Sequence, residues 1–392
     1  MGILLTNIVA FALPTNAYLN PLAAGYESAA DIIAWAVAFI FIEGKMRGLF
    51  SLLFGASMLL VLDRATAEGQ SSSQLHFRRM IFLFAFGMLH FWFIWDGDIL
   101  ALYALCGAVA YRFRHLSAEK LVRLGLLLVA GNMAFWAFVI ATAYGLKLDA
   151  ADSSGSAQAT YQQMADALGA SNGASIATNI ALYQQGYLAI VGERLSEHIS
   201  RPLENIFAYG LETLGLMAWG MALLKSGALT GGWPRSRLRR WMISGYIVGL
   251  PISAALAWFC WQQDFETLTN AIIFFLVNTP IRMAVLLGHV MVLIIASTQP
   301  APGAFTRRVA AAGRMAFSNY ILTSILMTSL FYGYGGGLYG QMSRAEIYLF
   351  APLVWMIMLA WSPLWLGVFR FGPLEWIWRS LARGQWQAFR LR

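Results

Sequence analysis

Apolar runs of about the length needed to cross a lipid bilayer recur along the whole chain, separated by short segments that hold most of its charges. A spanning helix needs about 20 apolar residues to cross a hydrocarbon core of about 30 Å. Of the 392 residues, 59% are hydrophobic and only 12% are charged, against roughly half and roughly a quarter in soluble domains. The chain is therefore expected to be an all-α, polytopic integral membrane helix bundle, which excludes a soluble globular enzyme.

Ten apolar runs have nearly the length of a membrane crossing. The expected spans lie at about 1–13, 46–63, 79–95, 98–113, 121–145, 204–225, 240–262, 270–297, 315–333 and 346–369. Segment 31–43 is too short to cross and ends in charges, so we expect an interfacial or re-entrant helix that lies on a surface. The short first run indicates a partly embedded helix or a chain that starts late, since a cleaved signal peptide requires a basic segment before it. All residues from 1 to 392 then form a single transmembrane domain.

Lysine and arginine gather in alternate loops, which predicts the orientation of the chain. Most of the 27 Lys and Arg fall near 64–79, 112–123, 225–240 and 307–314 and after residue 370. These segments are expected to be cytoplasmic, together with both termini. The long polar segment 147–203 is expected to be an extracytoplasmic loop with one or two short helices, which either caps a substrate site or connects two half-bundles. The tail at 373–392, with Trp between Arg, is typical of a cytoplasmic amphipathic helix on the inner leaflet.

Several classes of function find no support in the sequence. The net charge of +8 is spread over the loops and forms no single basic patch, which argues against nucleic acid as a partner. Cys106 and Cys260 lie inside apolar runs, so we expect neither a disulfide framework nor a metal site. The chain has no Walker A, H-E-x-x-H or G-x-S-x-G motif. ATPase, zinc protease and serine hydrolase functions are therefore without support.

The segment from Arg78 to Gly107 holds the first candidate site. Ten residues separate Arg79, at the cytoplasmic mouth of its span, from His90, which places them about 16 Å apart along a helix. His90 is then near mid-membrane, where an ionisable group usually serves a function; the alternative is a neutral core histidine bonded to a carbonyl. Asp96 and Asp98 close a tight outer turn, where they either cap the next helix or orient an acceptor.

Other charged and polar groups lie within or beside the expected spans. Glu212 and Arg282 have similar depth, so they either form a structural bridge or bind an acceptor. Glu43 and Arg47 are expected near the outer mouth, where they hold the interfacial helix or contact the substrate. Asn319 is expected one turn inside the inner interface, where it bonds either a cofactor or a neighbouring helix.

Four segments of the chain resemble a known family. They are IEGKMRGLFSLLFGASMLL (42–60), RRMIFLFAFGMLHFWFIWDGDILALYALCG (78–107), AAGRMAFSNYILTSIL (311–326) and FGPLEWIWRSL (371–381). Together they resemble the YeiB family of bacterial inner-membrane proteins, whose C-terminal half is a domain of unknown function. The family typically begins with an Asp-x-x-Arg-Gly segment before GILLTNI; that segment is absent here, so no role is assigned to it. The resemblance implies a multi-pass protein of the bacterial inner membrane.

The YeiB family resembles, more distantly, the transmembrane acyltransferases. Some of these carry an R-x10-H pattern that is tied to acyl-CoA use, and Arg79 and His90 match its spacing. The resemblance implies acyl-CoA, with acetyl-CoA as the preferred form, as a cytoplasmic co-substrate whose phosphates meet Arg78 and Arg79. His90 then acts as general base or becomes acylated itself.

The sequence thus supports an acyltransferase that acts on a small-molecule or glycan acceptor, with the lipid bilayer as its other partner. Two alternatives stay open. One is a secondary transporter or exporter of a small metabolite, in which His90, Glu212 and Arg282 are coupling or substrate groups. The other is a non-catalytic membrane scaffold. The oligomeric state is left open.

Overall fold

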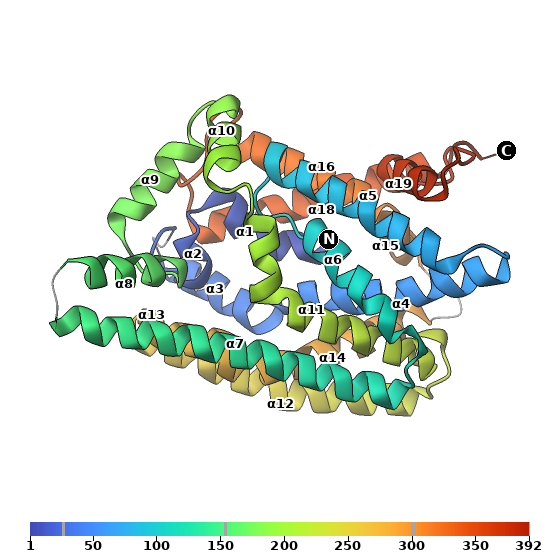
Figure 1. Ribbon diagram of the computed structural model, residues 1–392, viewed down its shortest axis with the longest axis horizontal. Helices are drawn as coiled ribbons and strands as arrows, with labels where there is room; N and C mark the ends of the chain where they lie inside the picture. The colour runs from blue at the N-terminus through green and yellow to red at the C-terminus, as the bar shows by residue number, and fades with distance from the viewer. Residues whose placement is uncertain (26–27, 153–154, 299–302, 392) are drawn as a thin grey trace.

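The computed structural model describes residues 1–25, 28–152, 155–298 and 303–391. Apart from one isolated bridge, the described residues form helices and loops only (Figure 1), which confirms the all-α class. In chain order the α-helices are α1 (Gly2–Ala12), α2 (Asn16–Leu19), α3 (Ala29–Phe41), α4 (Lys45–Ala67), α5 (Ser72–Phe93), α6 (Leu100–Ala110), α7 (Ala118–Asp152), α8 (Ser156–Ala167), α9 (Gly173–Tyr183), α10 (Tyr187–Glu197), α11 (Arg201–Lys225), α12 (Arg235–Gln262), α13 (Thr267–Ile272), α14 (Asn278–Ser297), α15 (Ala304–Arg314), α16 (Ala316–Phe331), α17 (Arg344–Ile347), α18 (Phe350–Leu366) and α19 (Pro373–Arg383).

Within the described residues, six stretches are long and apolar enough to cross a membrane. They are Ala29–Ala67, Ala118–Ala151, Arg201–Lys225, Arg235–Gln262, Thr267–Ser297 and Arg344–Leu366. All six overlap expected spans, and the first contains the span expected at 46–63. Thr267–Ser297 joins α13 and α14 through the π-helical turn η3 (Ile273–Val277). Helices α1 and α16 are apolar but shorter. The chain is therefore an all-α protein with the composition of a multi-pass membrane protein.

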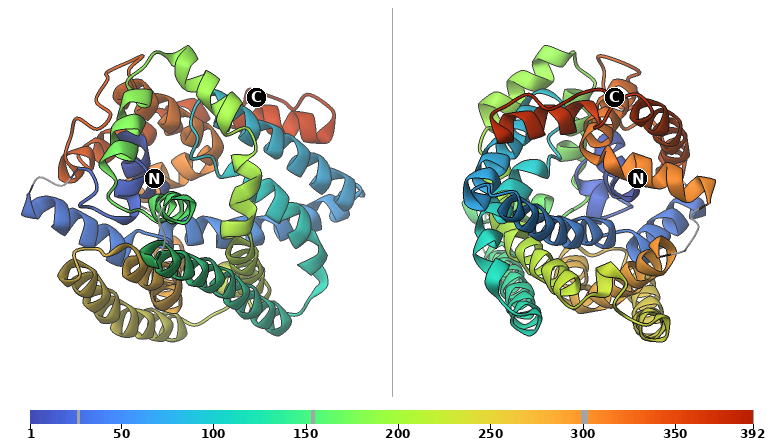
Figure 2. Two further views of the ribbon diagram at one scale, coloured as in Figure 1. Left: turned by 60° about the vertical axis from the view of Figure 1, so that its left-hand side comes forward. Right: turned by 90° about the vertical axis from the view of Figure 1, so that its right-hand side faces the viewer.

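The long helices run roughly parallel along the long axis of the molecule. Helix α12 packs along α14, and α11 packs between α7 and α4 (Figures 1 and 2). Helices α7 and α12 begin at one end of this bundle, the right-hand end in Figure 1, and α8 and α9 lie at the opposite end. The arrangement gives the bundle two ends of different character, one joined by short basic segments and one covered by short helices.

The first long stretch differs from the sequence prediction. A separate interfacial helix was expected at 31–43 and a span at 46–63, but α3 and α4 belong to one apolar stretch of 39 residues. The helix breaks for only one turn, at Gly44, whose φ of 71° is the left-handed conformation that glycine adopts readily. The break leaves the carbonyl of Phe39 free, and the buried ammonium of Lys45 donates a hydrogen bond to it. The predicted helix is therefore present as α3, within two residues of its expected bounds, and its place at a membrane surface stays a prediction.

The polar segment 147–203 holds three short helices, α8, α9 and α10, where one or two were expected. Helix α7 also continues to Asp152, past the expected end at 145. Asn172 fixes the start of α9, since its side-chain oxygen accepts the N–H groups of Ala174 and Ser175. These helices fold over one end of the bundle (Figure 1).

Helix α19 occupies only the first half of the predicted amphipathic tail, and it packs against α5 and α16. The buried carboxylate of Glu375 accepts the backbone N–H groups of Phe317 (2.7 Å) and Ser318 (3.0 Å). These are orphan donors at the start of α16, so Glu375 caps a helix that lies far from it in sequence. Much of α19 therefore faces protein.

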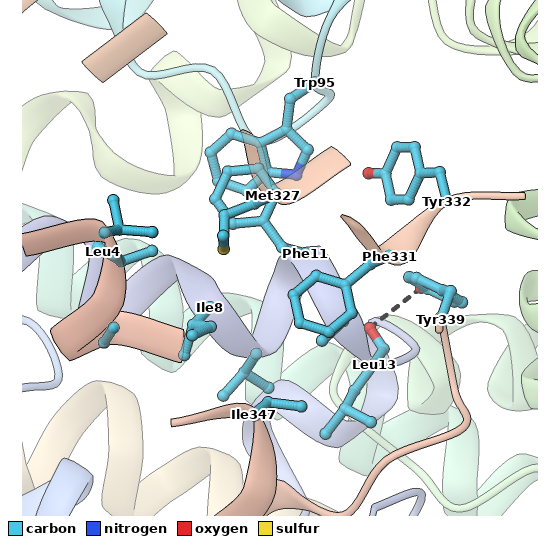
Figure 3. Close-up of a cluster of buried hydrophobic side chains, with 14 of the residues drawn as sticks. Leu4, Ile8, Phe11, Leu13, Trp95, Met327, Phe331, Tyr332, Tyr339 and Ile347 are labelled. Atoms are coloured by element: carbon cyan, nitrogen blue, oxygen red, sulfur yellow. Dashed lines mark hydrogen bonds between the residues drawn. The ribbon is translucent and has the colours of Figure 1, made fainter. Parts of the chain in front are cut away.

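Helix α1 lies inside the protein. Its residues Leu4, Ile8 and Phe11 are at most 3% exposed and pack against residues of α16, α17 and α18 (Figure 3). The indole of Trp95 stacks on Phe11 with ring centroids 3.9 Å apart. The expected short first span is thus a central packing element that brings the α5–α6 turn against the last third of the chain.

Candidate functional site

His90 and Asp98 form a buried pair at the turn between α5 and α6. The Nδ1 atom of His90 lies 2.8 Å from Oδ1 of Asp98, and both side chains are at most 1% exposed. The other carboxylate oxygen of Asp98 accepts the N–H of Ala101 at 2.9 Å, in the first turn of α6. Asp98 therefore takes the expected capping role at α6, and it also orients His90, a role that the sequence did not predict.

The second nitrogen of His90 has no hydrogen-bond partner within the described residues. With Asp98 as acceptor for the Nδ1 proton, Nε2 carries a lone pair. The rings of Tyr320 and Trp95 lie 5.0 Å and 6.2 Å from the imidazole, centroid to centroid. A histidine oriented by a carboxylate, with its other nitrogen free, is the arrangement of a general base in triad-type catalysis.

Arg78 and Arg79, the expected cationic mouth, lie under α19. The Arg79 guanidinium stacks over the ring of Trp378 at 4.1 Å, and Nη2 of Arg78 donates to the carbonyl of Leu381. Arg79 and His90 are eleven positions apart in sequence, which at 3.6 residues per turn puts both on one face of α5, about three turns apart. The two groups are thus aligned along α5, with α19 beside the arginines.

Asp96 lies apart from the His90–Asp98 pair, although both acids belong to one turn. Its Oδ2 atom accepts the hydroxyl of Tyr183 in α9 at 2.7 Å. Its Oδ1 atom lies 4.0 Å from Nη2 of Arg194 in α10, a residue only 2% exposed. The structure therefore assigns Asp96 to the cluster under α9 and α10.

Glu212, Arg282 and Arg47 form a buried ionic cluster in the middle of the bundle. Nη2 of Arg282 lies 2.6 Å from one carboxylate oxygen of Glu212, and Nη2 of Arg47 lies 3.1 Å from the other. The expected pairing of Glu212 with Arg282 is present, and Arg47 joins it from α4. Glu43 instead accepts the hydroxyl of Tyr18 at 2.7 Å. Glu43 in the turn is thus satisfied by α2, and Arg47 at the start of α4 is satisfied by α11.

Glu43 also lines a small internal cavity. The cavity has a volume of about 20 Å³, enough for about one water molecule, and Tyr18 and Arg344 line it as well. Within the described residues, no three His, Cys, Asp or Glu side chains are placed to hold a metal ion.

Comparisons with known proteins place the chain in a family. It is 31% identical to "Uncharacterized protein YxaH" of Bacillus subtilis over 98% of this chain and 92% of the relative. It is 30% identical to "Uncharacterized protein YeiB" of Escherichia coli over 97% of this chain and 92% of that relative. The chain belongs to the YeiB family.

A family model described as "Protein of unknown function (DUF418)" matches residues 223–385, in the C-terminal half of this YeiB-family chain. A third relative, "Uncharacterized 39.9 kDa protein in amylase 3'region" of Bacillus acidopullulyticus, is 24% identical over 97% of the chain and 90% of that relative. No solved structure matches. The resemblance noted from the sequence motifs is thus confirmed, with bacterial relatives that cover nearly the whole chain.

Asn319 is the remaining predicted site residue of this YeiB-family protein. Its amide donates to the carbonyl of Ala312 (2.9 Å) and to the hydroxyl of Ser362 (3.2 Å), and its oxygen accepts the indole N–H of Trp361 (2.8 Å). Two of these partners lie on α18. Of the two expected roles, the structure therefore shows the bond to a neighbouring helix.

Sequence reasoning missed Arg194, Tyr183 and Tyr332, which lie near Asp96. One signal was present: Ile190, Val191 and Arg194 share a helical face, and the first two are apolar. An arginine on the apolar face of an amphipathic helix points to a buried cation. The tyrosines carry no comparable signal.

Proposed function

We propose that this protein is a membrane-bound acyltransferase that moves an acyl group from cytoplasmic acyl-CoA to an acceptor in the membrane or at its outer face. Acetyl-CoA is the preferred donor. The observation that carries the proposal is the buried His90, whose Nδ1 is held by Asp98 at 2.8 Å while Nε2 has no partner within the described residues.

This geometry supports general-base chemistry. As the acceptor's oxygen or nitrogen attacks the thioester carbonyl, Nε2 of His90 takes the acceptor's proton, and Asp98 stabilises the imidazolium. The carbon–sulfur bond then breaks, and the CoA thiolate takes the proton back from His90. Alternatively, Nε2 itself attacks the thioester carbonyl, the carbon–sulfur bond breaks and CoA leaves as a thiolate; the acceptor then displaces the imidazole from the acyl group, and its proton passes to the thiolate.

We further propose a topology of ten spans in the bacterial inner membrane, with both termini in the cytoplasm. Six long apolar stretches and the shorter apolar helices α1 and α16 support it, and α5 and α6 supply the remaining two crossings. The alternation of basic loops along the sequence supports the orientation. In this topology α8–α10 lie outside, and α19 lies at the cytoplasmic side.

The alignment of Arg79 with His90 on one face of α5 supports a donor path from the cytoplasm. Arginine suits the phosphates of CoA, because its guanidinium binds phosphate oxygens in pairs. Since α19 covers Arg79 and holds Arg78 through the carbonyl of Leu381, donor binding at these arginines requires α19 to shift.

The test is thermal stabilisation of the purified protein by acetyl-CoA, because a ligand that binds the folded state raises its apparent stability. We expect acetyl-CoA to stabilise the native chain but not Arg79→Ala. It should still stabilise His90→Ala, although that variant no longer transfers the acyl group. Arg237→Ala is the matched control, since Arg237 also stacks on a tryptophan, Trp233, at 3.7 Å. Absence of stabilisation by acetyl-CoA and by longer acyl-CoAs would overturn the proposal.

The Arg47–Glu212–Arg282 cluster favours a second candidate, a secondary transporter or exporter. Two guanidinium groups around one carboxylate leave excess positive charge at the centre of the bundle, which suits an anionic metabolite. In that case, proteoliposomes that contain the protein should accumulate the metabolite without acyl-CoA. Arg282→Met should abolish this uptake, whereas His90→Gln should affect only the coupling of uptake to protons.

A further inference from the structure

Four buried hydrogen-bond donors near α10 have no acceptor within the described residues. They are Nε and Nη2 of Arg194, Nε1 of Trp95 and the hydroxyl of Tyr332. These side chains are at most 2% exposed, so bulk solvent does not satisfy them. A buried donor without an acceptor destabilises the folded protein, and several in one place indicate that a ligand supplies the acceptors.

The donors come from three separate segments and converge. Arg194 lies on α10, Trp95 lies in the turn after α5, and Tyr332 follows α16. The guanidinium of Arg194 is 5.9 Å from the ring of Tyr332. Figure 3 shows the indole nitrogen of Trp95 and the hydroxyl of Tyr332 turned toward one another, with no hydrogen bond between them. The fold thus directs donors from different elements at one region.

The two unpartnered groups of Arg194 define the chemistry of the ligand. Nε–H and Nη2–H form one edge of the guanidinium, two parallel donors that match a pair of oxygens on a carboxylate or a phosphate. Asp96 does not occupy this edge, because its Oδ1 is 4.0 Å from Nη2 and its Oδ2 accepts Tyr183. Although burial lowers it, the Asp96 carboxylate raises the pKa of Arg194 overall, so the guanidinium stays charged.

We propose that Arg194, Tyr332 and Trp95 bind the oxyanion, a carboxylate or a phosphate, of the acceptor. Naming the ligand as the acceptor rests on the proposed function. The ring of Trp95 lies 6.2 Å from that of His90, so one of the three donor side chains lies beside the proposed base. An acceptor that carries a hydroxyl or amine beside its oxyanion, as a hydroxy acid, an amino acid or a phosphate ester does, suits both these donors and the base His90.

Thermal unfolding of the purified chain without acyl-CoA tests the site directly. The probes are succinate and glycerol 3-phosphate, each compared with its neutral counterpart, succinamide or glycerol, at constant ionic strength. We expect a saturable rise in Tm with at least one oxyanion and none with the neutral compounds. The two probes distinguish a carboxylate ligand from a phosphate ligand. If neither oxyanion raises Tm, the inference is wrong.

Four variants assign the effect to the site. Tyr332→Phe removes only a hydroxyl and should weaken binding several-fold, and Arg194→Lys, which keeps the charge but not the two-donor edge, should weaken it tenfold or more. Asp96→Asn should tighten binding, because it removes the negative charge 4.0 Å from Arg194. Arg201→Gln, at a half-buried arginine that starts α11, should change nothing.

Weaker oxyanion binding in Arg194→Lys together with tighter binding in Asp96→Asn distinguishes a ligand site from a structural ion pair. If Arg194 serves only as the partner of Asp96, then Asp96→Asn lowers Tm and no variant alters the response to oxyanions, which would overturn the proposal. Because acyl-CoA is absent, the result is independent of the proposed function. Acetyl-CoA stabilisation without oxyanion binding refutes the site alone, and oxyanion binding without acetyl-CoA stabilisation refutes the acyltransferase alone.

Discussion

Nη2 of Arg282 on α14 lies 2.6 Å from Oε2 of Glu212 on α11, and both side chains are at most 6% exposed. Loss of one partner leaves a buried charge without compensation, which costs about 3–5 kcal/mol. We therefore expect Glu212→Ala to lower the free energy of unfolding by that amount, measured by denaturant titration in detergent micelles.

The control for this prediction is the exposed pair of Arg64 and Glu68, at 2.8 Å on the surface of α4. Glu68→Gln should leave the free energy of unfolding almost unchanged, because solvent screens exposed pairs. Similar small losses in both variants would show that the central cluster is solvated.

Asp98→Asn should separate stability from catalysis. The asparagine oxygen can still accept the N–H of Ala101, so we expect a loss of no more than about 1–2 kcal/mol of stability. Its amide now faces Nδ1 of His90 as a donor, which moves the imidazole proton to Nε2 and removes the base. Acyl transfer from labelled acetyl-CoA should fall about 10⁴-fold, by analogy with the wrong tautomer in triads, while acetyl-CoA binding persists. Transfer at the native rate would contradict the role given to His90.

Glycines let α4 and α11 approach closely. A Cβ atom at Gly55 would lie 2.1 Å from the carbonyl oxygen of Met217, and one at Gly220 would lie 1.8 Å from that of Leu52. Because backbone cannot yield as a side chain does, we expect Gly55→Ala and Gly220→Ala each to destabilise the protein by about 1–3 kcal/mol or more.

Gly145→Ala in α7 is the matched control for these variants, since no neighbouring atom lies within 4 Å of the position that a Cβ atom would take there. It should be neutral or stabilise by up to about 1 kcal/mol, through helix propensity. Denaturant unfolding in micelles measures all three, and equal effects at the three sites would show that the close approach of α4 and α11 is not maintained.

Glu266 gives a prediction for pH. Partial burial raises its pKa, but hydrogen bonds from Thr269 and Lys147 outweigh burial and hold the pKa at about 2, below the ordinary value of 4.5. A lowered pKa means that the stabilisation is present above pH 4.5 and is lost as the pH falls toward 2. Because the side chain is 41% exposed, screening keeps the effect below about 1 kcal/mol.

In Glu266→Gln, Tm should therefore decrease less between pH 5 and pH 2 than it does in the native chain. Above pH 6 the dependence of Tm on pH should be the same in both. Lys147→Met, which leaves the cap on Thr269 intact, should flatten it less. Identical acid limbs in the native chain and Glu266→Gln would refute the prediction.

The pairing of Glu212 with Arg282 was predictable, because charges within apolar runs must find each other or a cavity. The burial of His90 followed from its place within an apolar run, whereas its depth in the membrane stays a prediction. The break between α3 and α4 was predictable as well, since the apolar run stops at Glu43. The structure tolerates that charge because Tyr18, from a separate short helix, donates a hydrogen bond to it.

The cluster at Arg194 shows the other limit of sequence reasoning. It lies in a polar segment, where an arginine needs no partner, and its burial depends on Tyr332, which lies far along the chain and packs beside α9 and α10. Likewise, Asp96 and Asp98 are two residues apart, yet they face different clusters because the tight turn directs them to opposite sides. Local spacing could not separate their roles.

The cap that Glu375 provides has a consequence for the order in which the protein is completed. The carboxylate that satisfies the first N–H groups of α16 is made 58 residues after Phe317. A ribosome that has finished all of α18 has therefore not yet made the group that completes α16. The start of α16 stays exposed to solvent or to a chaperone during that interval, so the final closure of the bundle at α19 comes among the last steps of its biogenesis.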